Sequence, residues 1–244
     1  MGTSTSQRSP RTREWERVHR LYDDPQAPPE AIVGRILHAL TPATREAMAD
    51  AAVARCLGTL TSAGAGVLEG AWSLDPTLPA AADLAAALRA EAESDIARAR
   101  VASRFGELAL DALSAATLDA VAGAGGSPDV VRATLARYAA ERRLAELARA
   151  FTTHDVGYTF RHFVARDTPM HVGGPRLRTV DDAGRLADEI AGLCRRHTGG
   201  LAFGGLEDQL QRAAGEGGLP GHPLYRATIA QALGASLRAL GELT

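Results

Sequence analysis

The side chains best suited to chemistry are concentrated between Phe151 and Arg178. This stretch of 28 residues holds His154, His162 and His171, three of the chain's seven histidines. It also holds four of the eleven aromatic residues, whereas the flanking sequence is mainly alanine, leucine and arginine at helical spacing. A functional site is therefore expected here.

The spacing of these residues permits two interpretations. His154, Tyr158 and His162 lie four residues apart, so a helix would place all three on one face. Neutral imidazole is the commonest metal ligand, which makes these histidines and His171 candidate ligands for a transition metal or haem iron. No carboxylate completes an HExxH signature, however. The other interpretation is an aromatic helix packed in the core, with histidines hydrogen-bonded at its edge.

Three further residues complete the candidate binding set of this stretch. Arg161 lies beside His162, and Gly173 and Gly174 follow in the loop after Thr168-Pro169, where the helix is expected to break. The second half of the stretch thus places an Arg-His pair on a helix before a Gly-Gly loop.

This arrangement resembles the haem-ligand stretch of the tryptophan 2,3-dioxygenase superfamily, in which an Arg-His pair on a helix precedes a glycine-rich substrate loop. The resemblance covers about 15 residues and implies that His162 is the proximal iron ligand and that Gly173-Gly174 approaches substrate. The loop here reads HVGG and not GTGG, it lies closer to His162, and no matching distal-pocket segment precedes it.

A second pattern, Arg166-x4-His171, is similar to that of HEPN ribonucleases, in which an arginine and a histidine on one helix attack RNA. Pro169 lies between the two residues and prevents an uninterrupted helix across them.

The helix expected over 127–151 carries five arginines. Arg142 and Arg143 are the candidate partner-binding residues among them, and glutamates at 141 and 146 make a salt-bridged solvent face the alternative. Ser127-Pro128-Asp129 supplies an N-cap, a first-turn proline and an acidic first turn.

Hydrophobic periodicity predicts an all-α bundle of about eight helices, with no convincing strand. The expected helices cover 14–22, 29–40, 41–60, 80–122, 127–151, 180–197, 206–214 and 224–243, with a short apolar turn at 67–74. The central segment 80–122 would be about 65 Å long as one helix, so a break near Ser94-Asp95 or Gly106 is expected. A homodimer through this segment is the other way to bury so long a helix.

Composition limits the class of protein. An apolar fraction of 45% among 244 residues provides a sizeable core, and a net charge of −2 argues against nucleic-acid binding. We expect a disordered tail over 1–12 and one domain over 13–244, with a sub-boundary near 122–128. All 27 basic residues are arginine, which indicates a high-GC bacterial genome such as that of an actinobacterium. No membrane span or signal peptide is evident, which favours a cytoplasmic location.

Two functions remain open from the sequence. The leading hypothesis is a helical protein that binds a protein or small-molecule partner through residues 151–178 and the neighbouring arginines. The alternative is a metal- or haem-dependent enzyme that uses His154, His162 or His171 as ligands. Loss of function in His162→Ala with the fold retained would favour the enzyme.

Overall fold

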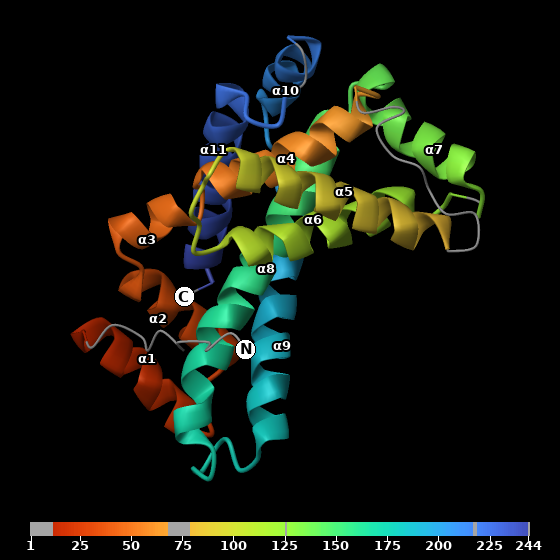
Figure 1. Cartoon of the computed structure of the whole chain (residues 1–244). Coiled ribbons are helices and arrows are strands. Elements are labelled where there is room, and N and C mark those ends of the chain that lie inside the picture. Colours follow the sequence, from red (N-terminus) through yellow and green to blue (C-terminus); the bar gives the residue numbers. More distant parts are fainter. Residues whose placement is uncertain (1–11, 68–78, 125, 217–218, 244) are drawn as a thin grey trace.

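The computed structural model describes residues 12–67, 79–124, 126–216 and 219–243, and the regular structure in these ranges is entirely helical (Figure 1). This confirms the predicted all-α class. The helices are α1 (Arg13–Asp23), α2 (Pro29–Ala39), α3 (Pro42–Ala47), α4 (Ala51–Gly64), α5 (Ala80–Arg98), α6 (Gly106–Val121), α7 (Pro128–Ala140), α8 (Leu144–Asp167), the 3₁₀ helix η1 (Thr168–His171), α9 (Val180–Thr198), α10 (Leu206–Gly215) and α11 (Pro223–Gly241).

Helices α8 and α9 form a long antiparallel pair, and most of the other helices pack against it (Figure 1). Gly157 allows α9 to approach closely, because a Cβ atom there would lie 2.9 Å from Cγ of Arg195. Phe151, Phe160 and Phe163 of α8 are fully buried. Three of the four aromatic residues in the stretch 151–178, which we call the distinctive stretch, therefore belong to the core.

Several of the remaining helices pack directly on this pair, and α5 packs on helices that cover it. Helices α4 and α6 pack against α8, and α5 packs against α4 and α6 (Figure 1). Helix α1 lies beside the far end of α8, where the ring of Trp15 meets that of Phe163 edge-on at 5.9 Å. Helix α11 contacts α2, α4, α8 and α9.

The segment 80–122 consists of two helices, α5 and α6, with the break at 99–105, directly before Gly106. The chain leaves α5 through Arg100, whose φ of 53° lies in the left-handed region. The two helices pack on each other, so each buries its apolar face within one chain. The homodimer was expected because a single helix over 80–122 would be too long to bury in one chain. Since the segment forms two shorter helices, that reason no longer applies.

Two segments that were expected to be single helices are divided in the structure. Residues 41–60 form α3 and α4, because the Asp50 side chain accepts the backbone N–H groups of Ala52 and Val53 and caps a new helix. Residues 127–151 form α7 and the first part of α8, because Arg142 turns the chain with φ of 52°. The five arginines therefore do not share one helix.

The predicted helix starts agree better with the structure. Thr41, Ser127 and Thr179 all cap helices through their hydroxyl groups, and Thr179 forms a reciprocal capping box with Asp182. Both cysteines, Cys56 and Cys194, are free and buried.

Some expectations concern residues outside the described ranges. Of the predicted tail at 1–12, only Thr12 is described, and it caps α1. Of the predicted turn at 67–74, only Val67 is described. The single domain with a sub-boundary near 122–128 stays a prediction. None of the described helices combines the length and apolar character needed to cross a membrane.

Candidate functional site

Helix α8 places Tyr158, Arg161 and His162 on the wall of a surface groove of about 440 Å³. We call this the α6–α8 groove, because α6 forms the opposite wall. Its apolar lining consists of Leu108, Ala115, Leu118 and Ala165, and its polar lining of Asp111, Ser114, Tyr158, Arg161 and His162. Three of the residues singled out in the sequence thus share one recess.

The His162 imidazole is available to a ligand. Its partial burial lowers its pKa, and the positive charges of Arg166 and Arg104 lower it further, although Asp167 opposes them. The ring is therefore neutral at pH 7, with one nitrogen able to donate and the other able to accept a hydrogen bond. Within the described ranges neither nitrogen has a hydrogen-bond partner.

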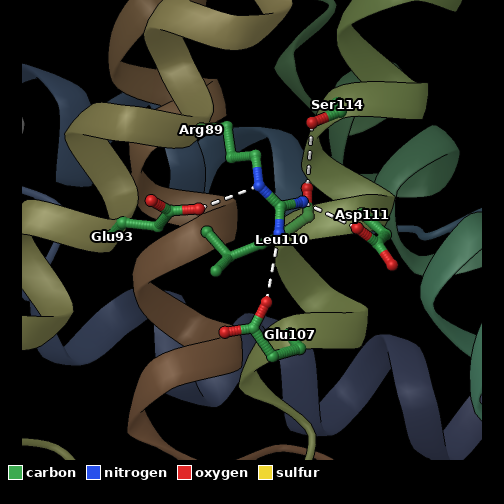
Figure 2. A network of polar contacts seen from close by, with 6 residues as sticks. All are labelled: Arg89, Glu93, Glu107, Leu110, Asp111 and Ser114. Atoms are coloured by element: carbon green, nitrogen blue, oxygen red, sulfur yellow. Dashed lines mark hydrogen bonds and ion pairs between the residues drawn. The ribbon is translucent and has the colours of Figure 1, made fainter. Parts of the chain in front are cut away.

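The α6 wall is fixed by Arg89 of α5 (Figure 2). Its guanidinium contacts Glu93 at 2.8 Å, Asp111 at 2.7 Å and Glu107 at 3.1 Å. Burial would lower the pKa of Arg89, but the hydrogen bonds and charges of Asp111 and Glu93 outweigh it and raise that pKa. Of these three carboxylates only Asp111 lines the groove, and it is the acidic group of this wall.

The opposite wall carries positive charge at Arg161. Its Nε donates to Asp188 of α9 at 2.6 Å, and both side chains are more than half exposed. An exposed pair of this kind contributes little to stability, so Arg161 can exchange this partner for a ligand at low cost. The groove therefore combines an acidic wall, a basic wall and an apolar floor.

His154 lies one turn before Tyr158 and does not line the groove. The two rings stack with centroids 6.0 Å apart, and Nε2 of His154 contacts Oδ2 of Asp119 at 2.7 Å. His154 thereby ties α8 to the end of α6 and supports the position of the Tyr158 ring.

His171 belongs to a separate cluster at the far end of α8. Its Nδ1 lies 2.9 Å from Oδ1 of Asp23, and its Nε2 lies 2.9 Å from Nδ1 of His19. The buried Tyr22 ring meets both imidazoles edge-on. Because His19 and Asp23 are about 150 residues from His171, the sequence offered no signal for this contact.

The Gly-Gly loop folds against this cluster and not over the α6–α8 groove. Gly173 has a φ of 92°, and its N–H donates to the carbonyl of Leu177 at 2.7 Å. A Cβ atom at Gly174 would lie 2.9 Å from the carbonyl oxygen of His171 and 3.3 Å from Oδ1 of Asp23. Both glycines are therefore accounted for by a tight turn.

Arg142 and Arg143 lie in the turn between α7 and α8. Arg142 pairs with Asp208, and Arg143 pairs with Glu141 and Glu146 at 2.9 Å each. The start of α8 lies about 21 Å along the helix from Tyr158, at 1.5 Å per residue. The two arginines are therefore exposed, ion-paired and remote from the groove.

The three candidate metal ligands do not converge on one centre. His154 and His162 are two helical turns apart, about 12 Å along the axis, and His171 contacts α1. In the part of the chain that the structure describes, no group of three or more His, Cys, Asp or Glu side chains could hold a metal ion.

The Arg166-x4-His171 pattern does not present its arginine to solvent. The Arg166 side chain is only 5% exposed and bonds Asp167 through two nitrogens, at 2.7 and 2.8 Å. Its guanidinium also stacks over Trp15 at 4.8 Å. Arg166 thus serves the packing of α1 on α8.

The chain matches no protein-family model, no curated protein and no solved structure. Its function has to be inferred from the groove residues themselves.

Proposed function

We propose that this protein acts by binding a partner protein in the cytoplasm, and that a peptide segment of the partner occupies the α6–α8 groove. The observation that carries the proposal is the combination of exposed apolar groups and solvent-accessible polar groups in one recess. Leu118 is 42% exposed, and within the described ranges neither the His162 ring nor the Tyr158 hydroxyl has a hydrogen-bond partner. Exposed apolar side chains beside available polar groups are typical of binding grooves.

The charges of the two walls indicate what the segment carries. An apolar side chain would cover Leu108 and Leu118, and a backbone amide would bond His162 or Tyr158. A basic group would face Asp111 and its neighbouring carboxylates, and an acidic group would replace Asp188 as the partner of Arg161.

A peptide-display selection on the immobilised full chain tests this proposal. We expect selected peptides to share an apolar residue between a basic and an acidic residue. Ala115→Arg fills the floor of the groove and should abolish their binding, whereas Ala227→Arg on the exposed part of α11 should not. Arg142→Ala and Arg143→Ala should also leave binding unchanged. Peptides that bind Ala115→Arg as well as the wild type would refute the proposal.

A spectrum, a metal analysis and the His162→Ala variant test the enzymatic alternative. An ultraviolet–visible spectrum and elemental analysis of protein purified without a histidine tag would detect haem, iron or zinc. A Soret band or near-stoichiometric metal that is lost in His162→Ala would replace partner binding by the cofactor-dependent enzyme. A small molecule that competes with the selected peptides would identify the ligand class as non-protein.

A further inference from the structure

A second groove lies on another side of the molecule, between α2, α3 and α11. Its volume is about 610 Å³, larger than that of the α6–α8 groove and within the usual range for small-molecule sites. Leu37, Ala49, Leu233 and Leu237 supply its apolar lining. We call it the α2–α11 groove, and none of its residues was singled out in the sequence.

The polar residues around this groove are predominantly cationic. Arg45, Arg226 and Arg238 line it, against the single carboxylate of Glu46. Arg226 reaches Glu46 only at 3.8 Å, both side chains being more than half exposed. Arg45 donates to the carbonyl of Leu37 at 2.9 Å and so retains further N–H groups for a ligand.

Arg238 is the least compensated of the three. It is exposed, and within the described ranges its guanidinium has neither an ion pair nor a hydrogen bond. Guanidinium groups bind carboxylates and phosphates through parallel N–H···O bonds, so this groove has the donors that an anionic head group requires.

Gly234 leaves open space in the lining of the groove. It lies in the middle of α11, where glycine is destabilising relative to alanine. A Cβ atom there would meet only Nη1 of Arg238, at an ordinary 3.6 Å. At Gly58, by contrast, a Cβ atom would lie 2.5 Å from the carbonyl oxygen of Pro220. Packing requires the glycine at 58 but not at 234.

From these observations we infer that the α2–α11 groove binds a single-tailed amphipathic anion, such as a medium-chain carboxylate. The tail lies over Leu37, Leu233 and Leu237 in the space left by Gly234, and the head group bonds Arg238 with Arg45 or Arg226. This site is independent of the α6–α8 groove and of the function proposed for it.

Isothermal titration of the full chain with decanoate, below its micelle-forming concentration, tests the inference. Decyltrimethylammonium has the same tail and a cationic head group, so it should bind at least tenfold more weakly. Affinity should rise along hexanoate, octanoate and decanoate, by up to about fourfold for each methylene that becomes fully buried. Ala115→Arg should bind decanoate as the wild type does.

Two variants locate the site. Gly234→Leu fills the groove and should weaken decanoate binding at least tenfold without lowering the melting temperature, because leucine favours the helix. Gly184→Leu on α9 is the matched control and should bind normally, since Gly184 is exposed and a Cβ atom there would have no neighbour within 4 Å. Arg238→Gln should weaken decanoate binding more than it weakens binding of decanol.

Three results would overturn the inference. They are absence of decanoate binding, equal binding of the cationic amphiphile, and unchanged binding in a folded Gly234→Leu variant. If the first result came with co-sedimentation on anionic lipid vesicles, the groove would recognise a membrane surface and not a free amphiphile.

Discussion

The buried carboxyl group of Asp155 should make the stability of this protein depend on pH. Asp155 lies on α8 and is 1% exposed, and within the described ranges its Oδ1 has no hydrogen-bond partner. Burial raises its pKa to about 8, with a smaller contribution from the negative charge of Asp50. At pH 7 the folded protein therefore holds this side chain mainly in its protonated form.

The size and sign of the effect follow from the two pKa values. In the unfolded chain the pKa of an aspartate is about 3.9, so between about pH 4 and pH 8 the folded state binds a proton that the unfolded state has released. Stability therefore falls as pH rises through this window, by up to about 1.4 kcal/mol per pH unit. Between pH 5 and pH 7 the contribution of Asp155 amounts to about 2.7 kcal/mol.

Urea unfolding followed by circular dichroism at pH 5, 6 and 7 measures this contribution. Asp155→Asn has the same shape and no titrating proton, so its free energy of unfolding should gain about 2.7 kcal/mol relative to the wild type between pH 5 and pH 7. The comparison cancels other groups, including His19 and His162, whose lowered pKa values make acid destabilising. Asp181→Asn, at an exposed carboxylate, is the control and should parallel the wild type.

The reasoning would be refuted if the wild type and Asp155→Asn lost or gained stability in parallel over this range. The absolute stability of Asp155→Asn is less informative, because a buried amide without partners carries its own cost of about 1–3 kcal/mol. The difference between the two proteins in how the free energy of unfolding changes with pH identifies the proton bound by Asp155.

Three further substitutions test the turn at Arg100, the buried ion pair of Arg166 and the exposed ion pair of Arg161. Arg100→Gly should raise the free energy of unfolding by about 1 kcal/mol, because glycine adopts the left-handed conformation of this position without strain; a lower midpoint in urea would contradict this. Asp167→Asn should cost about 3–5 kcal/mol in the same assay, because it leaves the buried Arg166 charge unpaired. Asp188→Asn, which removes the exposed partner of Arg161, should cost less than about 1 kcal/mol, and equal losses in the two variants would argue against a buried pair.

Local sequence predicted the helical class and many helix starts correctly. Thr41, Ser127 and Thr179 could be identified because an N-cap hydroxyl and its proline or acidic neighbour act within one turn of chain. The division of 80–122 was expected near Gly106, where α6 begins. The helix end at Arg142 was missed, because the left-handed residue there is arginine and not glycine. The sequence therefore joined α7 and α8, which the fold separates.

Composition indicated the distinctive stretch as a candidate site, but it did not predict which elements its residues contact. Spacing alone placed Tyr158 and His162 on one face of a helix, since that follows from 3.6 residues per turn. Which elements oppose that face depends on packing between distant segments. His171 contacts His19, and His154 contacts Asp119, so neither histidine lies in the groove with His162.

The sequence by itself determined that the chain is helical and where most helices begin, because periodicity and capping are local properties. It also indicated residues 151–178, with three histidines and four aromatic residues, as the candidate site. Only the tertiary structure decided which of those residues share a groove. It also revealed the α2–α11 groove, whose lining comes from residues 37–49 and 226–241. No local pattern marks such a site, because its apolar floor and its arginines are ordinary for helices until the fold brings them together.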